Sequence, residues 1–296
     1  MAEEKTNRDK LTRHLAKIEL TTRILVEGLQ SGPHHSVFKG RGVEFTDLRE
    51  YVPGDDIRTI DWNVTARFNH PFIREFTEER DQTFYFVLDV SGSGLFGSRV
   101  TRKEKMLEVF ASLSFAAQRN NDRVGLCLFS DRVEAFFPAR RGRKHILSLI
   151  ENVITHKPAS QKTDLSAALQ FLYHVLKRKS SIIILSDFAS PALFPVMTIM
   201  RKRHEVIAIR ITDPREGVLP DIGKIVLEDP ETGEQVTADT SDKNFQAEYN
   251  KCVRSFEKNL ETGFVRAGIG RVTLSTDESY EIPLRRFFQG LRQRRT

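Results

Sequence analysis

An alternation of apolar strands and amphipathic helices between residues 83 and 211 constrains the fold of this chain most. The run 83–88 predicts a strand buried on both faces, and Thr101 with Glu104 forms a capping box that starts a helix. Further strands are expected at 124–129, 133–137, 182–185 and 206–211, and further helices at 143–155, 164–178 and 191–203. Because parallel strands need long crossover connections, this order predicts an α/β fold with a mostly parallel sheet and helices on both faces.

The flanking segments have a different character. A helix is expected over 7–30, stopped by Gly32-Pro33, and is followed by short strands, one of them around 72–76. Beyond residue 212 a turn-rich stretch precedes a long helix, a last strand at 271–274 and a basic tail. Three parts are therefore expected: 1–80 with a helix and a small β-rich segment, 81–212 with the α/β domain, and 213–296 as a C-terminal extension that completes the fold.

Composition narrows the class of protein. The chain has 296 residues, of which 39% are hydrophobic and 29% charged, as in ordinary soluble globular proteins. No apolar run approaches the ~20 residues that span a bilayer. The first residues, MAEEKTNRDK, lack the apolar core of a signal peptide, so a cytoplasmic protein is expected.

The two cysteines and the basic tail predict no special chemistry. Cys127 and Cys252 suit neither a disulfide framework nor a zinc set, and both are expected to be buried. The net charge is +6, and five arginines fall in the last twelve residues. A solvated helix face is favoured there over a patch for nucleic acid or lipid, so nucleic-acid binding is not expected.

Oxygen-bearing side chains gather where the central strands end. In a parallel sheet, ligands lie beyond the carboxyl ends of the strands. Two carboxylates and three hydroxyls meet this condition and form an oxygen-only set that suits Mg²⁺ or Mn²⁺. The candidate metal ligands are Asp89, Ser91, Ser93, Thr163 and Asp187. Asp164 is expected to cap its helix instead.

The charge of this set has a consequence for binding. Asp89 and Asp187 together would neutralise a divalent ion, and the hydroxyls add no charge. A metal held in this way keeps affinity for a further anionic oxygen. We therefore expect a protein partner to offer an Asp or Glu to the metal.

The order of these residues resembles a known motif. D-x-S-x-S at 89–93, then Thr163 in a loop, then Asp187 at the end of the next central strand are similar to the metal-ion-dependent adhesion site of von Willebrand factor A-type domains. The resemblance covers about 82–212 and implies a Rossmann-like A-type domain with Asp89, Ser91, Ser93, Thr163 and Asp187 as its metal site. Gly94 departs from the family, which usually has Met there.

The segment before this domain carries a second resemblance. SVFKGRGVEFTDLREYVPGDDIRTIDWNVTAR at 36–67, followed by FIREFTEERD, is similar to the signature of the bacterial domain-of-unknown-function 58 family. That resemblance implies a MoxR-type AAA+ ATPase as partner, in metal-cofactor insertion, complex maturation or envelope stress. The acids and arginines of this segment are expected to make ion pairs and helix caps, with a partner-docking face as the alternative.

Two other functions are compatible with parts of this sequence. Gly92, Gly94 and Gly97 match a dinucleotide fingerprint, but the capping box starts the helix only near Thr101, too late to face a pyrophosphate. A metal-dependent enzyme acting on phosphorylated or nucleic-acid substrates is the alternative to a binding module. No His or Lys stands at a strand end to act as a general base, so a non-enzymatic module is favoured.

Overall fold

The computed structural model describes residues 44–68, 70–77, 82–97, 100–190, 192–217, 219–229 and 231–293. The chain divides into two compact units, Phe38–Gln82 and a larger one that contains Thr83–Thr296. The helix expected over 7–30 lies outside the described residues.

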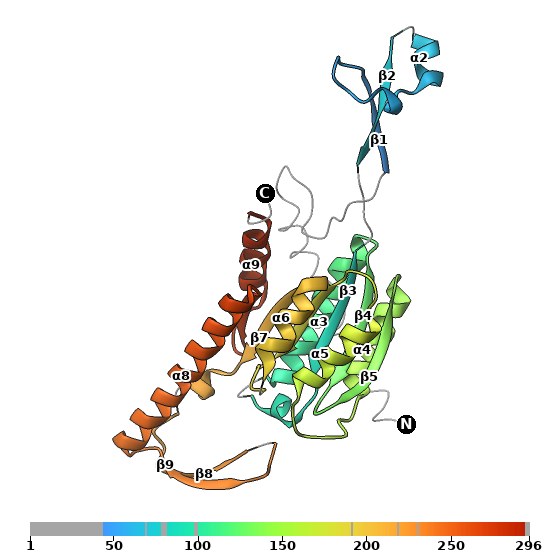
Figure 1. Ribbon diagram of the computed structural model, residues 1–296. Coiled ribbons are helices and arrows are strands. Elements are labelled where there is room, and N and C mark those ends of the chain that lie inside the picture. The colour runs from blue at the N-terminus through green and yellow to red at the C-terminus, as the bar shows by residue number, and fades with distance from the viewer. Residues whose placement is uncertain are drawn as a thin grey trace. The chain divides into compact units, whose positions relative to one another are not determined.

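A six-stranded sheet in the order β10-β7-β6-β3-β4-β5 forms the centre of the larger unit (Figure 1). All neighbours in it are parallel except β4 and β5, which form an antiparallel hairpin. The prediction of a mostly parallel α/β sheet is therefore confirmed. The strands are β3 (Thr83–Asp89), β4 (Arg123–Phe129), β5 (Val133–Arg140), β6 (Ser181–Ser186), β7 (Glu205–Thr212) and β10 (Gly270–Ser275).

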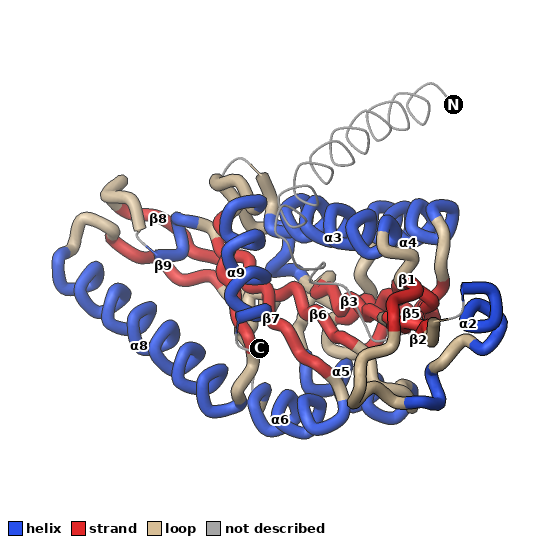
Figure 2. The backbone as a smooth tube through the Cα atoms, turned by 90° about the horizontal axis from the view of Figure 1, so that it is seen from above, coloured by secondary structure: helices blue, strands red, loops and turns tan. Residues whose placement is uncertain are grey.

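Helices cover both faces of this sheet, which explains the unbroken apolar runs of its strands. Figure 2 shows α3 (Arg102–Arg119) and α4 (Arg143–Thr155) on one side, and α5 (Leu165–Val175) and α6 (Leu193–Arg203) on the other. Successive residues of β3 point to opposite sides: Phe86 stacks edge-on against Phe110 of α3, whereas Val87 joins the cluster that includes residues of α5.

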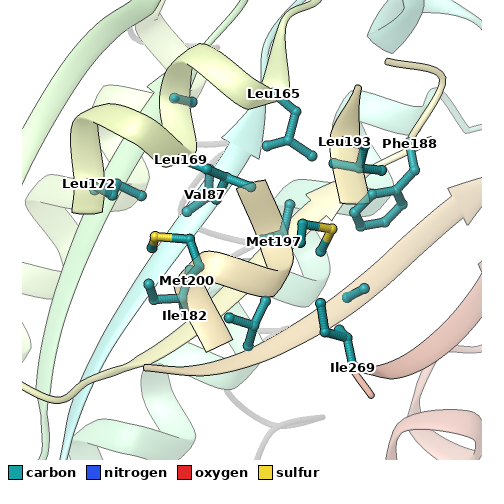
Figure 3. Packing of buried hydrophobic residues seen from close by; sticks show 14 of the residues in the cluster. Val87, Leu165, Leu169, Leu172, Ile182, Phe188, Leu193, Met197, Met200 and Ile269 are labelled. Carbon is teal, nitrogen blue, oxygen red and sulfur yellow. The ribbon is translucent and has the colours of Figure 1, made fainter. Parts of the chain in front are cut away.

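The core beneath α5 and α6 follows from helical spacing. Leu165, Leu169 and Leu172 lie on one stripe of α5 and are fully buried. Figure 3 shows them packed with Met197 and Met200 of α6 among the residues of this cluster. The apolar side that this spacing gives to α5 is therefore the side that faces the core.

The capping box at the start of α3 is present as predicted. Thr101 Oγ1 accepts a hydrogen bond from the Glu104 amide at 3.1 Å, and the Thr101 amide donates to Glu104 Oε2 at 2.8 Å. This cap fixes Arg102 as the first helical residue, directly beyond the loop that follows β3.

The smaller unit is a β-ribbon with two short helices. Its strands β1 (Glu44–Glu50) and β2 (Phe72–Thr77) pair antiparallel, and the 3-10 helix η1 (Ile57–Thr59) and helix α2 (Trp62–Phe68) lie between them in sequence. Arg49 donates to both carboxylate oxygens of Asp55, at 2.7 and 2.8 Å. Asp56 caps η1, and Asp61 accepts from the Asn63 amide at the start of α2. These acids therefore serve as ion pairs and caps, as the sequence predicts.

The C-terminal part adds elements that sequence reasoning described incompletely. The turn-rich stretch contains a short helix and an antiparallel hairpin, and the long helix and last strand follow as expected. Because β10 pairs with β7, residues beyond 212 complete the central sheet. The elements are α7 (Pro214–Gly217), β8 (Lys224–Glu228), β9 (Gln235–Asp239), α8 (Lys243–Ala267), β10 and α9 (Glu281–Gln293).

Two expectations about side chains need correction. Cys127 is buried as expected, but Cys252 is exposed because α8 buries only its last turns. The basic tail is helical up to Gln293 as part of α9, and Phe288 in the tail and Leu284 one turn before it are buried at 1% and 0% exposure. One side of this helix therefore packs into the core, whereas a solvated helix face was expected. No helix in the described ranges combines the length and apolarity needed to cross a bilayer.

Replacing Phe288 tests the structural role of α9. Phe288→Ala should lower the free energy of unfolding by about 3–5 kcal/mol, the range for removing a buried aromatic ring. Ile282→Ala on the same helix is the matched control, because Ile282 is 56% exposed. Urea unfolding followed by far-UV circular dichroism measures both, since the only tryptophan, Trp62, lies in the smaller unit. Equal losses in the two variants would contradict the burial of this helix face.

Candidate functional site

The carboxylate of Asp89 lies at the end of the central strand β3. The side chain is buried, at 4% exposure, and both oxygens accept hydrogen bonds. The Ser91 amide donates to Oδ1 at 3.0 Å, and the Ser186 hydroxyl at the end of β6 donates to Oδ2 at 2.8 Å. Both donors are neutral groups.

Two serine hydroxyls lie together just after this carboxylate. Ser91 is the N-terminal cap of the 3-10 helix η2 (Gly92–Leu95), and the turn places Ser91 Oγ 3.1 Å from Ser93 Oγ. Both serines are buried. The Gly92 amide donates to the Gln161 carbonyl at 2.9 Å, which ties this loop to the loop that carries Thr163.

Thr163 holds a carboxylate from a distant part of the chain. Its hydroxyl donates to Glu231 Oε1 at 2.6 Å, and its amide donates to Glu231 Oε2 at 3.3 Å. The next residue, Asp164, caps α5 by accepting from the Ala167 amide at 3.1 Å, as predicted. Sequence reasoning identified Thr163 but gave no sign of Glu231.

Asp187 is paired with an arginine that sequence reasoning also missed. Arg102, the first residue of α3, donates to Asp187 Oδ2 at 2.7 Å, and the Ala189 amide donates to Oδ1 at 3.0 Å. The same guanidinium donates to the Ser93 carbonyl at 3.3 Å and pairs with the Glu216 carboxylate of α7. Arg102 is only 8% exposed, so these bonds are shielded from water.

The electrostatics of the site are set by unbalanced negative charge. The pKa of Asp89 is raised to about 6, mainly by burial and then by the charge of Asp187, and the hydrogen bonds from Ser91 and Ser186 offset only part of this shift. When Asp89, Asp187 and Glu216 are ionised, the single guanidinium of Arg102 pairs with Asp187 and Glu216, and the two donors to Asp89 are neutral. Two negative charges are left over, which is the number that a divalent cation neutralises.

The structure thus brings together most of the predicted metal ligands. Asp89, Ser91 and Ser93 form one cluster, and Asp187 is close enough to Asp89 to shift its pKa. Thr163 lies on the adjoining loop with its hydroxyl turned to Glu231. The described part of the chain contains no cluster of three or more His, Cys, Asp or Glu side chains that could hold a metal. The oxygen-only donor set and its excess negative charge fit a hard divalent cation.

Comparison with known proteins places the chain in a family. Residues 47–259 match the family described as "Protein of unknown function DUF58". The chain belongs to this family. It is 30% identical over 289 residues to the uncharacterized protein Rv1480 of Mycobacterium tuberculosis, covering 96% of this chain and 90% of that protein. Uncharacterized protein YeaD of Bacillus subtilis is 25% identical over 114 residues, covering 38% of this chain and 27% of the relative.

Two solved structures show distant similarity to this DUF58 protein. One is the conserved hypothetical protein BatB from Bacteroides thetaiotaomicron, with a TM-score of 0.47, 15% identity, and coverage of 72% of this chain and 99% of that one. The other is an aerotolerance-related membrane protein from Bacteroides fragilis, with a TM-score of 0.47, 15% identity, and coverage of 71% and 97%.

The raised pKa of Asp89 predicts how stability depends on pH. Its folded-state pKa of about 6 lies above the ordinary value of 3.8, so its favourable contribution is present below 3.8 and is lost as pH rises through 6. In Asp89→Asn the side chain at this position stays neutral at every pH, so this loss of stability does not occur. In EDTA, the variant should gain about 2–3 kcal/mol of unfolding free energy relative to wild type between about pH 4 and pH 7. Urea unfolding at several pH values measures this, and a difference that does not change with pH would contradict it.

Proposed function

We propose that this DUF58 protein is a non-enzymatic, metal-dependent protein-interaction module. In this proposal residues 81–212 form a von Willebrand A-like domain, and its metal-ion-dependent adhesion site consists of Asp89, Ser91, Ser93, Thr163 and Asp187. The observation that carries it is the meeting of Asp89, the two serine hydroxyls and Asp187 at the carboxyl ends of neighbouring parallel strands. Ligand sites of open α/β sheets lie at this edge.

The charges around Asp89 support a metal at this site. A buried carboxylate whose pKa is raised to about 6 is poorly stabilised by its two neutral donors. Oxygen ligands of this kind suit Mg²⁺ or Mn²⁺, which need few protein carboxylates. When bound, such an ion offers a coordination position to a carboxylate oxygen from a partner. Arg102 orients Asp187 and limits the charge that the ion has to neutralise.

The proposed function includes a protein partner. The DUF58 family to which the chain belongs is the basis for proposing a MoxR-type AAA+ ATPase that presents an Asp or Glu to the metal. In this role the protein is an adaptor in the assembly or maturation of a complex. We also propose a cytoplasmic location, because an AAA+ partner depends on ATP.

Removing Asp89 tests the metal and the partner together. Asp89→Ala should weaken Mg²⁺ binding by more than about 100-fold, because replacing a residue that only supports a metal ligand already costs up to about that much. The variant should also fail to capture a purified MoxR-type ATPase. Asp131→Ala is the matched control, because Asp131 follows the end of the adjacent strand β4 and bonds Ser160 outside the cluster. Isothermal titration with Mg²⁺ and pull-down with and without EDTA are the measurements.

Two results would contradict the proposal. Capture of the ATPase that is unchanged in Asp89→Ala and in EDTA would remove the metal from the interaction. Mg²⁺-dependent hydrolysis of phosphoesters, lost in Asp89→Ala and kept in Asp131→Ala, would favour a metal-dependent enzyme on phosphorylated or nucleic-acid substrates instead.

A further inference from the structure

The tip of the β8–β9 hairpin is a turn that carries Glu231 and is closed by its own hydrogen bonds. The Gly233 amide donates to the Asp229 carbonyl at 2.8 Å, and the Asp229 amide donates to the Glu234 carbonyl at 2.9 Å. The Asp229 carboxylate accepts from the Glu231 amide at 2.8 Å and from Thr232 Oγ1 at 2.9 Å. The bond from the Glu231 amide is the main cause of the lowered pKa of Asp229. All of these bonds lie within the turn.

The carboxylate of Glu231 is held by two donors of one residue. The hydroxyl of Thr163 binds one oxygen at 2.6 Å and the amide of Thr163 binds the other at 3.3 Å. Thr163 is also the residue that the metal site requires from this loop. A glutamate of this chain therefore already contacts one residue of the proposed metal site.

The hairpin between the tip and its base makes little contact with the core. Val226 of β8 and Val236 of β9 are 61% and 55% exposed. The base is fixed: Thr240 is fully buried, accepts from the Ile222 amide at 3.0 Å and donates to the Gly223 carbonyl at 2.8 Å. Figure 1 shows the hairpin in orange beside the start of α8. Among the described residues of the turn, Glu231 ties the tip to the loop of Thr163 through two hydrogen bonds, so weakening these bonds would loosen the tip.

We propose that Glu231 is an internal ligand of the strand-end site and that the site selects a glutamate presented by a tight turn. A partner segment of the same chemistry competes with Glu231, and the hairpin moves away when it binds. This inference rests on the proposed function of the site as a binding module, and it adds the class of ligand and the means by which the free protein covers its own site.

Loss of the Glu231 contact should be measurable in the free protein. Glu231→Gln removes the charge and changes the shape of the side chain very little. Amide hydrogen exchange over 224–239 should become about ten-fold faster, the size expected when a hydrogen bond to a charged group is weakened. Glu234→Gln is the matched control, because Glu234 belongs to the same turn and takes part in it through its backbone. It should exchange like wild type.

A peptide probe tests the ligand class. The labelled peptide LEDPETGEQV, residues 227–236 of this chain, is titrated into the full-length protein in Mg²⁺ and followed by fluorescence polarisation. Glu231→Gln, with its own site uncovered, should bind the peptide about ten-fold more tightly than wild type or Glu234→Gln. The peptide LEDPQTGEQV should bind none of them. Thr163→Val, which keeps the shape of threonine without its hydroxyl, should lose binding.

The outcomes separate this inference from the proposed function. If Glu231→Gln and Glu234→Gln show the same hydrogen exchange and the same peptide affinity, Glu231 is not an internal ligand. The same conclusion follows if neither variant binds the peptide. Mg²⁺ binding that persists in Asp89→Ala overturns the metal site, whatever the hairpin does. Faster exchange and tighter peptide binding in Glu231→Gln, together with loss of Mg²⁺ binding in Asp89→Ala, support both.

Discussion

The buried carboxylate of Asp89 belongs to the last residue of β3, a strand that helices cover on both faces and that β4 and β6 flank. Water cannot reach it freely, and its donors are one amide and one hydroxyl. The protein cannot relax this burial without breaking the sheet, because Asp89 continues the parallel pairing of β3 with β4. Polar groups surround this carboxylate: two serine hydroxyls lie together just after it, and the neighbouring carboxylate of Asp187 is paired with a guanidinium.

Arg102 connects the site to the architecture. The capping box fixes the start of α3, so the first side chain of the helix points back to the sheet edge, where it joins Asp187, the Ser93 carbonyl and Glu216. Removing a buried arginine that two carboxylates share would leave those carboxylates without this partner, which is strongly destabilising. Glu216 comes from the segment beyond residue 212, so the C-terminal part contributes to the site as well as to the sheet.

The sequence was sufficient for the parts of the fold that depend on local periodicity. The parallel strands, the start of α3 and the buried stripe of α5 all appear where apolar spacing and capping residues predict them. The clustering of Asp89, Ser91 and Ser93 was predictable because their spacing is local. Strands β8 and β9 were missed because each has only five residues and most of their side chains are exposed, although QVTAD in β9 alternates polar and apolar residues.

Contacts between distant residues could not be predicted in this way. Glu231 lies 68 residues from Thr163, and Asp187 lies 85 residues from Arg102. Nothing in the local pattern distinguishes Glu231 from the other acids of its turn. The burial of Leu284 and Phe288 was present in the sequence as a spacing of four, but the arginines around them suggested a solvated surface.

The position of β10 has a consequence for how the chain matures. β7 lies inside the sheet only because β10 pairs along it, and β10 comes more than fifty residues later in the sequence. During synthesis, β7 therefore leaves the ribosome with one edge unpaired, and an unpaired apolar edge invites pairing with other chains. Helix α8 is made in this interval. A pause in translation before β10 would leave the nascent chain with an open sheet, which is the state that a chaperone would have to protect.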